Sequence, residues 1–263
     1  MNTLTIDIGN TTIAFGLFSA TNIGGSAHIK HFGGGRGKRI SLTFKLPTHA
    51  KGISFYRKNI LRKVKEGEVG KVIICSVVPE KTGALKKLAS QIFKKKVLVV
   101  GRDIKVPIIN RYKNPRQVGQ DRLVKAFAGL KLFGKGLILV DFGTAVTFDV
   151  VSRKGEYLGG LIFPGIDLSL EALYLKTALL PRIKIKRPVD IIGKDTATSM
   201  NSGIVFGMAG VCDEVIDRLL RKFKGYKVVA TGGNVNFIKQ YSSRIKVVRP
   251  NLTLEGLRML LHE

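Results

Sequence analysis

Two stretches of the chain repeat the same pattern of hydrophobic and polar residues. Residues 3–18 (TLTIDIGNTTIAFGLF) and residues 137–151 (LILVDFGTAVTFDVV) each run from apolar residues into Asp, an apolar residue and Gly, and become apolar again after small hydroxyl residues. Each pattern predicts a strand, a tight turn that contains glycine, and a second strand. Because the stretches lie about half a chain apart, they predict two related halves that each open on the same hairpin.

Between and after these hairpins, the pattern alternates between strand and helix. Alternating or short apolar runs predict strands at residues 39–46, 71–75, 97–100 and 227–230. Apolar residues at helical spacing predict helices at residues 57–65, 85–93 and 211–223. Such alternation is typical of an α/β protein. We expect two halves, residues 1–115 and residues 116–263.

The composition adds one unusual feature, a strong excess of basic residues. The chain has 45 Lys and Arg against 18 Asp and Glu, a formal net charge of +27. The excess runs along the whole chain, which is weaker evidence for a polyanion partner than a patch would be. Basic residues do accompany Phe44, Phe55 and Tyr56 within residues 36–65, so a basic nucleic-acid-binding or regulatory protein is one alternative.

The sequence also bears on the compartment of the protein. No apolar run approaches the roughly 20 residues that span a bilayer, and the N-terminal residues show no signal peptide. Cys75 and Cys212 lack CxxC spacing, which argues against a disulfide framework or a zinc site. We therefore expect a cytoplasmic protein without a membrane partner.

The turn of the first hairpin has the residues of a phosphate-binding loop. Gly9 lets the backbone approach a ligand closely, while Asn10, Thr11 and Thr12 can donate hydrogen bonds to phosphate oxygens. Asp7, at the end of the strand, would then face a Mg²⁺ ion on those phosphates, because magnesium favours carboxylate and phosphate oxygens. For one copy of the turn, an ordinary hairpin in which the Asp accepts hydrogen bonds from turn N–H groups is an equally good interpretation.

The second copy of the turn changes this balance. Asp141, Gly143 and Thr144 repeat the pattern in the second half. Two copies favour two loops that grip one nucleotide in an interdomain cleft. Residues 231–234 (TGGN) form a third glycine turn, which could receive an adenosine or a phosphate. A turn from strand to helix also needs glycine for steric reasons, so this third signal is weak alone.

Residues 112–127 (YKNPRQVGQDRLVKAF) combine turn residues with an Asp-Arg pair at the start of an amphipathic helix. Asp121 can accept a proton from a substrate hydroxyl while Arg122 binds an anionic or hydroxyl group nearby. Asp121 also suits the first turn of a helix, because the helix dipole favours an acid there. The spacing alone does not decide between these two roles.

Gly24–Arg39 stands apart as a glycine-rich, basic segment. It resembles a Walker A loop only superficially, because Phe32 stands where the first Gly belongs and Arg39 where a Ser or Thr would hold magnesium. We interpret the segment as a hairpin tip without an assigned role. His28 and His31 within it lack a second pair of metal ligands.

A series of nine motifs also runs along the chain. The motifs are DIGNT at 7–11, SVVP at 76–79, YKNPRQVGQDR at 112–122, DFGTAVTFD at 141–149, GGLIFPG at 159–165, TALLP at 177–181, IGKDT at 192–196, TGG at 231–233 and LTLEGL at 252–257. In this order they resemble the motifs of type III pantothenate kinases, a family of the actin/Hsp70/sugar-kinase group.

The resemblance implies a fold and a reaction. The fold would be α/β, a duplicated actin/Hsp70-like (ribonuclease H-like) two-domain fold with an interdomain nucleotide cleft. Residues 1–115 and 116–263 would be its two actin-like ATPase halves, the second with the substrate base and the dimer contacts. The reaction would be ATP-dependent phosphorylation of the primary hydroxyl of pantothenate to 4'-phosphopantothenate, the first step of coenzyme A biosynthesis.

The resemblance also implies roles for individual residues. The residues that would hold the ATP phosphates and magnesium are Asp7, Ile8, Gly9, Asn10, Thr11, Thr12, Ile13 and Ala14, with Thr144 as a further ATP contact. The residues that would bind pantothenate are Tyr112, Gly119, Gln120, Asp121, Arg122 and Thr196. Asp121 would be the general base, and Asp141 would bind the monovalent cation, potassium or ammonium, that the family requires. A homodimer is implied too, with contacts that we expect around Leu161–Ile183.

Two residues depart from the family pattern. Gln120 occupies a position where a small Ala is usual, and could crowd the substrate pocket. Val146 replaces the commoner Thr and could slightly change the cation or phosphate loop. Neither removes an expected ligand. A kinase of the same fold that acts on another small hydroxyl compound, such as a sugar, is a second alternative, although it has no reason to carry the motif at 112–122.

Overall fold

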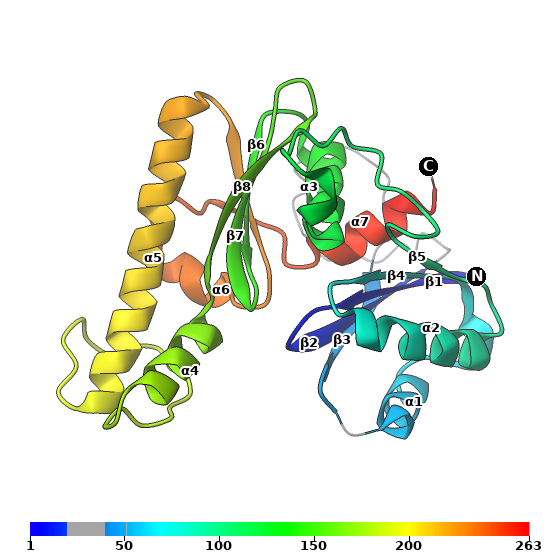
Figure 1. Ribbon diagram of the computed structural model, residues 1–263, viewed down its shortest axis with the longest axis horizontal. Coiled ribbons are helices and arrows are strands. Elements are labelled where there is room, and N and C mark those ends of the chain that lie inside the picture. Colours follow the sequence, from blue (N-terminus) through cyan, green and yellow to red (C-terminus); the bar gives the residue numbers. More distant parts are fainter. Residues whose placement is uncertain (20–39, 51, 263) are drawn as a thin grey trace, which may run out of the picture. The chain divides into compact units, whose positions relative to one another are not determined.

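The computed structural model describes residues 1–19, 40–50 and 52–262 of the chain. These residues form two compact units, each with its own sheet (Figure 1). The first unit comprises Met1–Ile109, Lys113–Phe133 and Leu252–Glu263, and the second comprises Asn110–Tyr112 and Gly134–Asn251. The segment Gly24–Arg39, for which we expected a hairpin tip, lies outside the described residues.

The sheet of the first unit has the strand order β3-β2-β1-β4-β5. Its strands are β1 (Asn2–Ile8), β2 (Thr12–Phe18), β3 (Ile40–Pro47), β4 (Val69–Ser76) and β5 (Val97–Val99). β2 pairs antiparallel with both β1 and β3, whereas β4 pairs parallel with both β1 and β5. The helices are α1 (Ile53–Leu61), α2 (Pro79–Phe93), α3 (Gln120–Phe133) and α7 (Leu252–Leu260), with short 3-10 turns η1 (Glu66–Glu68) and η2 (Pro115–Gln117).

Helices cover both faces of this sheet because its central strands are apolar on both faces. In β4, Val72 and Ile74 join the core that includes residues of α1 and α2, whereas Ile73 and Cys75 join the core that includes residues of α3 and α7. Successive residues of a strand point to opposite faces, so a continuous apolar run needs cover on both sides. Within this unit, Figure 1 shows α1 and α2 on one side of the sheet and α3 and α7 on the other.

The sheet of the second unit has the strand order β10-β9-β6-β7-β8. Its strands are β6 (Leu137–Phe142), β7 (Ala145–Val151), β8 (Tyr157–Pro164), β9 (Lys227–Thr231) and β10 (Val247–Val248). β7 pairs antiparallel with both β6 and β8, whereas β9 pairs parallel with both β6 and β10. The helices are α4 (Ile166–Lys176), α5 (Thr196–Lys222) and α6 (Val235–Ile238), followed by the 3-10 turn η3 (Lys239–Tyr241).

The two sheets therefore share one topology. When the strands are numbered within each unit, both sheets have the order 3-2-1-4-5, with three antiparallel strands followed by two that run parallel to the first. The two predicted hairpins are β1–β2 and β6–β7, at equivalent places in the two units. The duplicated, actin/Hsp70-like α/β fold predicted from the sequence is confirmed.

The compact units do not follow the boundary expected at residue 115. The helices α3 and α7 both come after that residue, yet both belong to the first unit. Their apolar side chains cover the face of the first sheet that carries Ile73 and Cys75. The chain therefore returns to its first unit at its C-terminal end.

Helix α1 lies nearer the N-terminus than the helix expected at residues 57–65. It begins at Ile53 and ends at Leu61. Val64, which we counted as a helical residue, is buried in the core of the first unit from the turn after the helix, where its N–H donates to the carbonyl of Ile60 at 2.9 Å. The helical spacing of apolar residues in the sequence therefore continues to Val64, beyond the end of the helix at Leu61.

Helix α5 is much longer than the helix expected at residues 211–223. It begins at Thr196, where the Asp195 carboxylate accepts a hydrogen bond from the backbone N–H of Thr198 at 2.8 Å, and the Thr198 hydroxyl accepts one from the N–H of Asp195 at 3.1 Å. This reciprocal capping fixes the start of the helix. None of the described helices is both long and apolar enough to cross a membrane.

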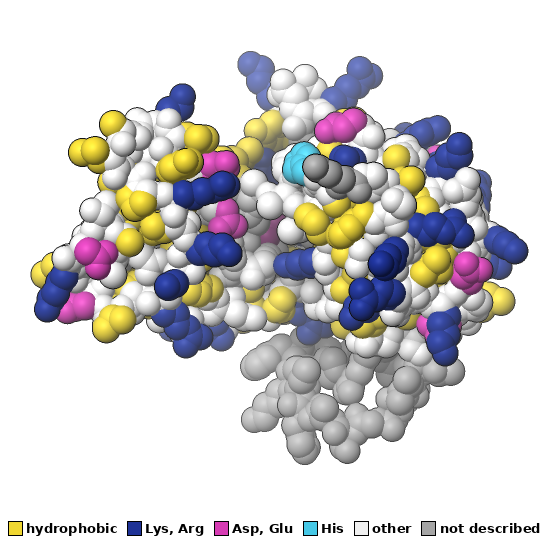
Figure 2. Space-filling view, turned by 90° about the horizontal axis from the view of Figure 1, so that it is seen from below, with side chains coloured by type: hydrophobic (Ala, Val, Ile, Leu, Met, Phe, Trp, Pro, Cys, Tyr) yellow, Lys and Arg dark blue, Asp and Glu magenta, His cyan; other side chains and the backbone are white. Residues whose placement is uncertain are grey.

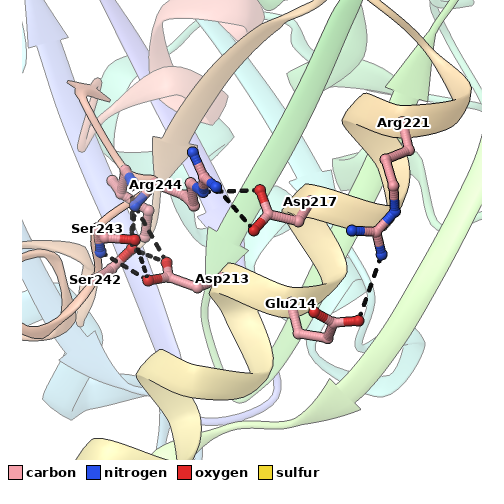
Figure 3. A network of polar contacts seen from close by, with 8 residues as sticks. Asp213, Glu214, Asp217, Arg221, Ser242, Ser243 and Arg244 are labelled. Carbon is pink, nitrogen blue, oxygen red and sulfur yellow. Dashed lines mark hydrogen bonds and ion pairs between the residues drawn. The ribbon is translucent and has the colours of Figure 1, made fainter.

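A polar network ties α5 to the segment between η3 and β10 (Figure 3). The Asp213 carboxylate accepts hydrogen bonds from the hydroxyls of Ser242 and Ser243 and from the N–H groups of Ser243 and Arg244. One turn further along α5, Asp217 pairs with the Arg244 guanidinium through contacts of 2.7 and 3.0 Å. Acidic residues of α5 thus hold the turn that leads into the edge strand of the second sheet.

The close packing of α7 on α3 can be tested at Gly256. A Cβ at Gly256 would lie 2.8 Å from both Cγ1 and the carbonyl oxygen of Val124, whereas a Cβ at Gly83 in α2 would meet nothing within 4 Å. We predict that Gly256→Ala lowers the free energy of unfolding by about 1–2 kcal/mol, because overpacking outweighs the better helix propensity of alanine. Gly83→Ala, with the same gain in propensity and no clash, is expected to raise it by up to about 1 kcal/mol. Urea unfolding followed by circular dichroism measures both; equal stabilisation by the two variants would contradict the packing.

Candidate active site

Asp7 lies at the end of the central strand of the first sheet. It is the penultimate residue of β1, where it pairs with Ala14 of β2 and Cys75 of β4. Its neighbours Ile6 and Ile8 are buried in the core that α1 and α2 share. Because side chains alternate along a strand, the Asp7 carboxylate points to the opposite face. That is the face covered by α3 and α7, on which Cys75 also lies.

The turn after Asp7 presents its polar side chains to solvent. The Gly9 N–H donates to the carbonyl of Thr12 at 3.0 Å, and the Thr48 hydroxyl donates to the carbonyl of Gly9 at 2.7 Å, so the backbone of the turn is held from both sides. Asn10, Thr11 and Thr12 are exposed. Their amide and hydroxyl groups therefore lie at the surface of the first unit, and their role in holding a phosphate stays a prediction.

The apolar residues of the expected ATP loop have a different place. Ile8 and Ile13 are fully buried in the core of the first unit, and Ala14 is half-buried. The side chains of Ile8 and Ile13 are therefore not available to a ligand. Only the backbone of these two residues could contact ATP.

Asp141 occupies the equivalent place in the second sheet. It is the penultimate residue of β6 and pairs with Thr147 of β7 and Thr231 of β9. Its neighbours Val140 and Phe142 are buried in the core of the second unit, so the Asp141 carboxylate points to the other face. The two Asp residues thus occupy matching registers in the two sheets.

Two glycines lie against the Asp141 turn. The Gly165 N–H donates to the carbonyl of Thr144 at 3.0 Å, and a Cβ at Gly165 would clash with carbonyl oxygens of the turn. Gly232 has a φ of +100°, and a Cβ there would clash with the Asp141 carboxylate and lie 2.6 Å from the N and O atoms of Phe142. The TGG turn is therefore required by close packing, the steric reason that the sequence left open. Thr144 itself is exposed.

Asp121 lies in the first turn of α3, as predicted. Its Oδ2 accepts a hydrogen bond at 2.8 Å from Nζ of Lys125, one helical turn further along. The Lys125 side chain is only 2% exposed, and the neighbouring Arg122 is buried too. A Cβ at Gly119 would lie 2.6 Å from Oδ1 of Asp121, so the missing side chain leaves room for the carboxylate.

The charges around Asp121 keep its carboxylate ionised. Burial acts to raise the pKa of Asp121, but the charge and hydrogen bond of Lys125, helped by Arg122, outweigh it and hold that pKa below its usual range. Burial, with the negative charges of Asp7 and Asp121, raises the pKa of the Cys75 thiol well above its usual value. At neutral pH the site therefore contains an ionised Asp121 beside a neutral thiol.

Lys125 did not stand out in the sequence as a functional residue. A Lys four residues after an Asp on a predicted helix is a signal for an ion pair, and could have pointed to it. That spacing alone is typical of exposed helix faces, where such pairs contribute little. The burial of Lys125 is what distinguishes this pair, and burial follows only from the packing of α3.

The structure places both residues that depart from the family pattern. Gln120 lies against the loop after β5, because a Cβ at Gly101 would meet Cδ of Gln120 at 2.8 Å. Val146 is buried in the core of the second unit, and its effect on the cation or phosphate loop stays a prediction. Crowding of the substrate pocket by Gln120 stays a prediction.

The residues expected to bind pantothenate fall into both units. Gly119–Arg122 belong to the first unit, while Tyr112 and Thr196 belong to the second. The Tyr112 N–H donates to Oδ1 of Asn110 at 3.0 Å, and its ring lies against Gly159, where a Cβ would be 3.2 Å from the ring. Thr196 is the exposed first residue of α5. The joint role of these residues in binding pantothenate stays a prediction.

The described residues contain no group of three or more His, Cys, Asp or Glu side chains that could hold a metal ion. Asp7 and Asp141 each offer a single carboxylate next to a hairpin turn. Magnesium is usually bound through one or two carboxylates together with substrate phosphates. The donor set at Asp7 therefore fits a magnesium ion that is shared with a bound nucleotide.

The packing of the TGG turn can be tested with two glycines of positive φ in the second unit. Gly232 has a φ of +100° and close neighbours, whereas Gly134 has a φ of +83° and nothing within 4 Å of a Cβ. Alanine at either position costs about 1–2 kcal/mol for the backbone conformation alone. We predict that Gly232→Ala costs about 1–3 kcal/mol more than Gly134→Ala, because only it pushes a methyl group into the Asp141 turn. Thermal unfolding compares them; equal losses would show that the TGG turn does not pack closely on β6.

Comparisons with known proteins identify relatives along nearly the whole chain. The sequence pattern of type III pantothenate kinases matches residues 3–218. The type III pantothenate kinases of Citrifermentans bemidjiense and Geobacter sulfurreducens are each 42% identical over 258 residues, which cover 98% of this chain and 97% of theirs. That of Persephonella marina is 42% identical over 262 residues, 97% of this chain and 96% of its own.

Solved structures agree on the fold. A Baf family transcriptional activator from Campylobacter jejuni matches with a TM-score of 0.58 at 19% identity, over 98% of this chain and 97% of its own. The ethanolamine utilization protein EutJ from Carboxydothermus hydrogenoformans matches with a TM-score of 0.53 at 14% identity, over 99% and 90%. At these low sequence identities, the two matches show only that the fold is shared. The family pattern and the full-length relatives show that the chain belongs to the type III pantothenate kinase family.

Proposed function

We propose that this protein transfers the γ-phosphoryl group of ATP to the primary hydroxyl of pantothenate, with Asp121 as the general base. The product is 4'-phosphopantothenate, and the reaction is the first step of coenzyme A biosynthesis. The observation that carries the proposal is the likeness to type III pantothenate kinases over nearly the whole chain. An ionised Asp121 on the same side of the first sheet as Asp7 supports it.

The chemistry needs little more than alignment and charge neutralisation. Phosphoryl transfer passes through a loose transition state, in which the attacking and leaving oxygens lie in line with the phosphorus. In the proposal, Asp121 accepts the proton of the pantothenate hydroxyl as its oxygen attacks the γ-phosphorus. The bond from that phosphorus to the bridging oxygen breaks, and ADP leaves with the electron pair.

We assign the phosphates of ATP to the polar turn after Asp7. The N–H groups of the turn and the exposed side chains of Asn10, Thr11 and Thr12 suit phosphate oxygens. Magnesium bound to Asp7 and the phosphates would neutralise charge on the transferred group. In the second unit, we assign Thr144 to ATP. We assign Asp141 to the monovalent cation, because its carboxylate is an oxygen ligand of the kind that hard cations prefer.

For pantothenate we assign Gly119–Arg122, Tyr112 and Thr196. Pantothenate carries a carboxylate, and the Arg122 guanidinium is suited to such a group. The exposed hydroxyl of Thr196 at the start of α5 and the half-buried Tyr112 supply further polar contacts. These roles rest on the likeness to the family.

We propose a homodimer that forms through the second unit. Large apolar side chains between residues 161 and 183 are exposed, among them Ile162 at 66%, Leu175 at 64% and Leu179 at 90%. Exposed apolar patches on soluble proteins usually mark interaction sites. We also place the protein in the cytoplasm, where thiols stay reduced, which suits the free and buried Cys75 and Cys212.

Two other functions are less well supported. A kinase of another small hydroxyl compound would share the fold, but the family match extends through the motif at 112–122. A nucleic-acid-binding protein would need its basic side chains gathered on one surface. Figure 2 shows Lys and Arg side chains scattered over the face in view, with acidic and apolar side chains among them. On this face, basic side chains mixed with acidic and apolar ones give no support to the nucleic-acid alternative.

The base assignment can be tested by turnover. We predict ATP- and pantothenate-dependent ADP release by the wild-type protein, stimulated by potassium. Asp121→Asn is expected to lower kcat by about 10²–10⁴-fold, because the hydroxyl proton then has no acceptor. Glu66→Gln, which neutralises an exposed acid of η1, is the matched control and should keep wild-type turnover. Wild-type release that is the same without pantothenate would refute the function, while full activity of Asp121→Asn would refute only the role of Asp121.

The dimer can be tested by charge placed on the apolar surface. We expect a wild-type mass of twice the chain mass in light scattering coupled to gel filtration. The double variant Ile162→Asp and Leu175→Asp should shift it to the monomer, because two buried carboxylates would be left unpaired at the interface. Ile109→Asp replaces an equally exposed apolar residue of the first unit and should stay dimeric. A monomeric wild-type protein at micromolar concentration would contradict the dimer.

A further inference from the structure

The two carboxylate oxygens of Asp121 have different surroundings. Oδ2 accepts a hydrogen bond from Nζ of Lys125 at 2.8 Å. Oδ1 lies over the backbone of Gly119, where a Cβ would come within 2.6 Å of it. One oxygen is therefore engaged by a cation from its own helix, and the other lies over a residue that has no side chain.

Lys125 is an unusual partner for a catalytic carboxylate. Its side chain is 2% exposed, and α3 is buried at every position from Arg122 to Gly129. A buried ammonium group is costly unless it is paired and hydrogen-bonded. The ion pair with Asp121 offsets part of this cost, and it holds the two side chains together at 2.8 Å.

Apolar residues pack between α3, which carries this pair, and the first sheet. Val124 and Phe127 of α3 pack with Ile73 and Cys75 of β4, and Cys75 is itself fully buried. Exposed ion pairs gain little energy in water and are screened by salt. The Asp121–Lys125 pair is held against an apolar core, so its geometry is fixed by packing.

We propose that Lys125 is a positioning residue for the general base: it holds Oδ2 of Asp121, so that Oδ1 is the oxygen that receives the proton of the substrate hydroxyl. This inference rests on the proposed function, because it gives one oxygen of Asp121 a specific role in the same reaction. Gly119 completes the arrangement, since any side chain there would occupy the space at Oδ1. The proton passes from the hydroxyl to Oδ1 and later to solvent, while Oδ2 keeps its hydrogen bond from Nζ of Lys125; the ion pair is restored when the proton leaves.

The charged groups around Asp121 predict how the pKa of Asp121 changes when Lys125 is replaced. The carboxylate of Asp7 on β1, the thiol of Cys75 on β4 and the guanidinium of Arg122 on α3 lie in the same electrostatic environment. Burial acts to raise the pKa of Asp121, and Lys125 is the largest influence that lowers it. Without Lys125 the pKa of Asp121 rises, so the base becomes protonated at a higher pH.

The test compares Lys125→Met with Lys131→Met, which removes an exposed lysine of the same helix. We expect Lys125→Met to lower kcat on the order of 10²-fold with little change in the KM for ATP, because the base is misplaced and the nucleotide is not. The acid limb of its kcat profile should move to higher pH, and Lys125→Arg should recover part of kcat. Lys131→Met should match the wild-type protein in all three measurements.

A second variant keeps the test decisive if Lys125→Met does not fold. Gly119→Ala places a methyl group at Oδ1 and should also lower kcat, whereas Gly67→Ala, where a Cβ meets nothing within 4 Å, should not. Wild-type kcat and pH profile in Lys125→Met, or wild-type kcat in Gly119→Ala, would overturn the inference and leave the proposed function standing. A wild-type protein that does not phosphorylate pantothenate would instead overturn the function.

Discussion

The strict alternation of side chains along the two central strands is the constraint on which the candidate site depends. In β1, the buried Ile6 and Ile8 flank Asp7, and in β6 the buried Val140 and Phe142 flank Asp141. A shift of one residue would turn Asp7 into the apolar core that α1 and α2 share, or Asp141 into the core of the second unit. Packing of the hydrophobic cores therefore determines the face of the sheet to which each carboxylate points, at the ends of β1 and β6.

The same alternation relates the first turn to the proposed base. Cys75 is the neighbour of Asp7 across β1 and β4, and it packs in the core that includes residues of α3. Asp121 and Lys125 belong to that helix, and the charges of Asp7 and Asp121 both act on the Cys75 thiol. A single sheet face thus carries the Asp7 carboxylate, a buried ion pair and a neutral thiol. Acidic residues are few in this basic chain, and several of them form specific polar contacts. Asp213 and Asp217 of α5 are further examples.

Much of the fold could be predicted from the sequence, because the signals are local. The two Asp-apolar-Gly hairpins and the alternating elements gave the duplicated α/β fold, and the structure has the same strand order in both sheets. The N-terminal half of α5 was missed, because its start is set by the capping of Asp195 and Thr198, which apolar spacing does not reveal. The grouping of α3 and α7 with the first sheet depends on contacts between distant parts of the chain. Lys125 was missed for a related reason: it is one of eight successive buried residues of α3, and apolar spacing does not reveal that a charged residue lies among them.

Identification of the product tests the central claim, phosphoryl transfer to the pantothenate hydroxyl, most directly. ³¹P nuclear magnetic resonance of the wild-type protein with ATP, magnesium, potassium and pantothenate would follow both products in one sample. The account predicts a new phosphomonoester signal, that of 4'-phosphopantothenate, which grows in equal amount with ADP. ADP that accumulates without that signal, or no change in ATP at all, would contradict the account.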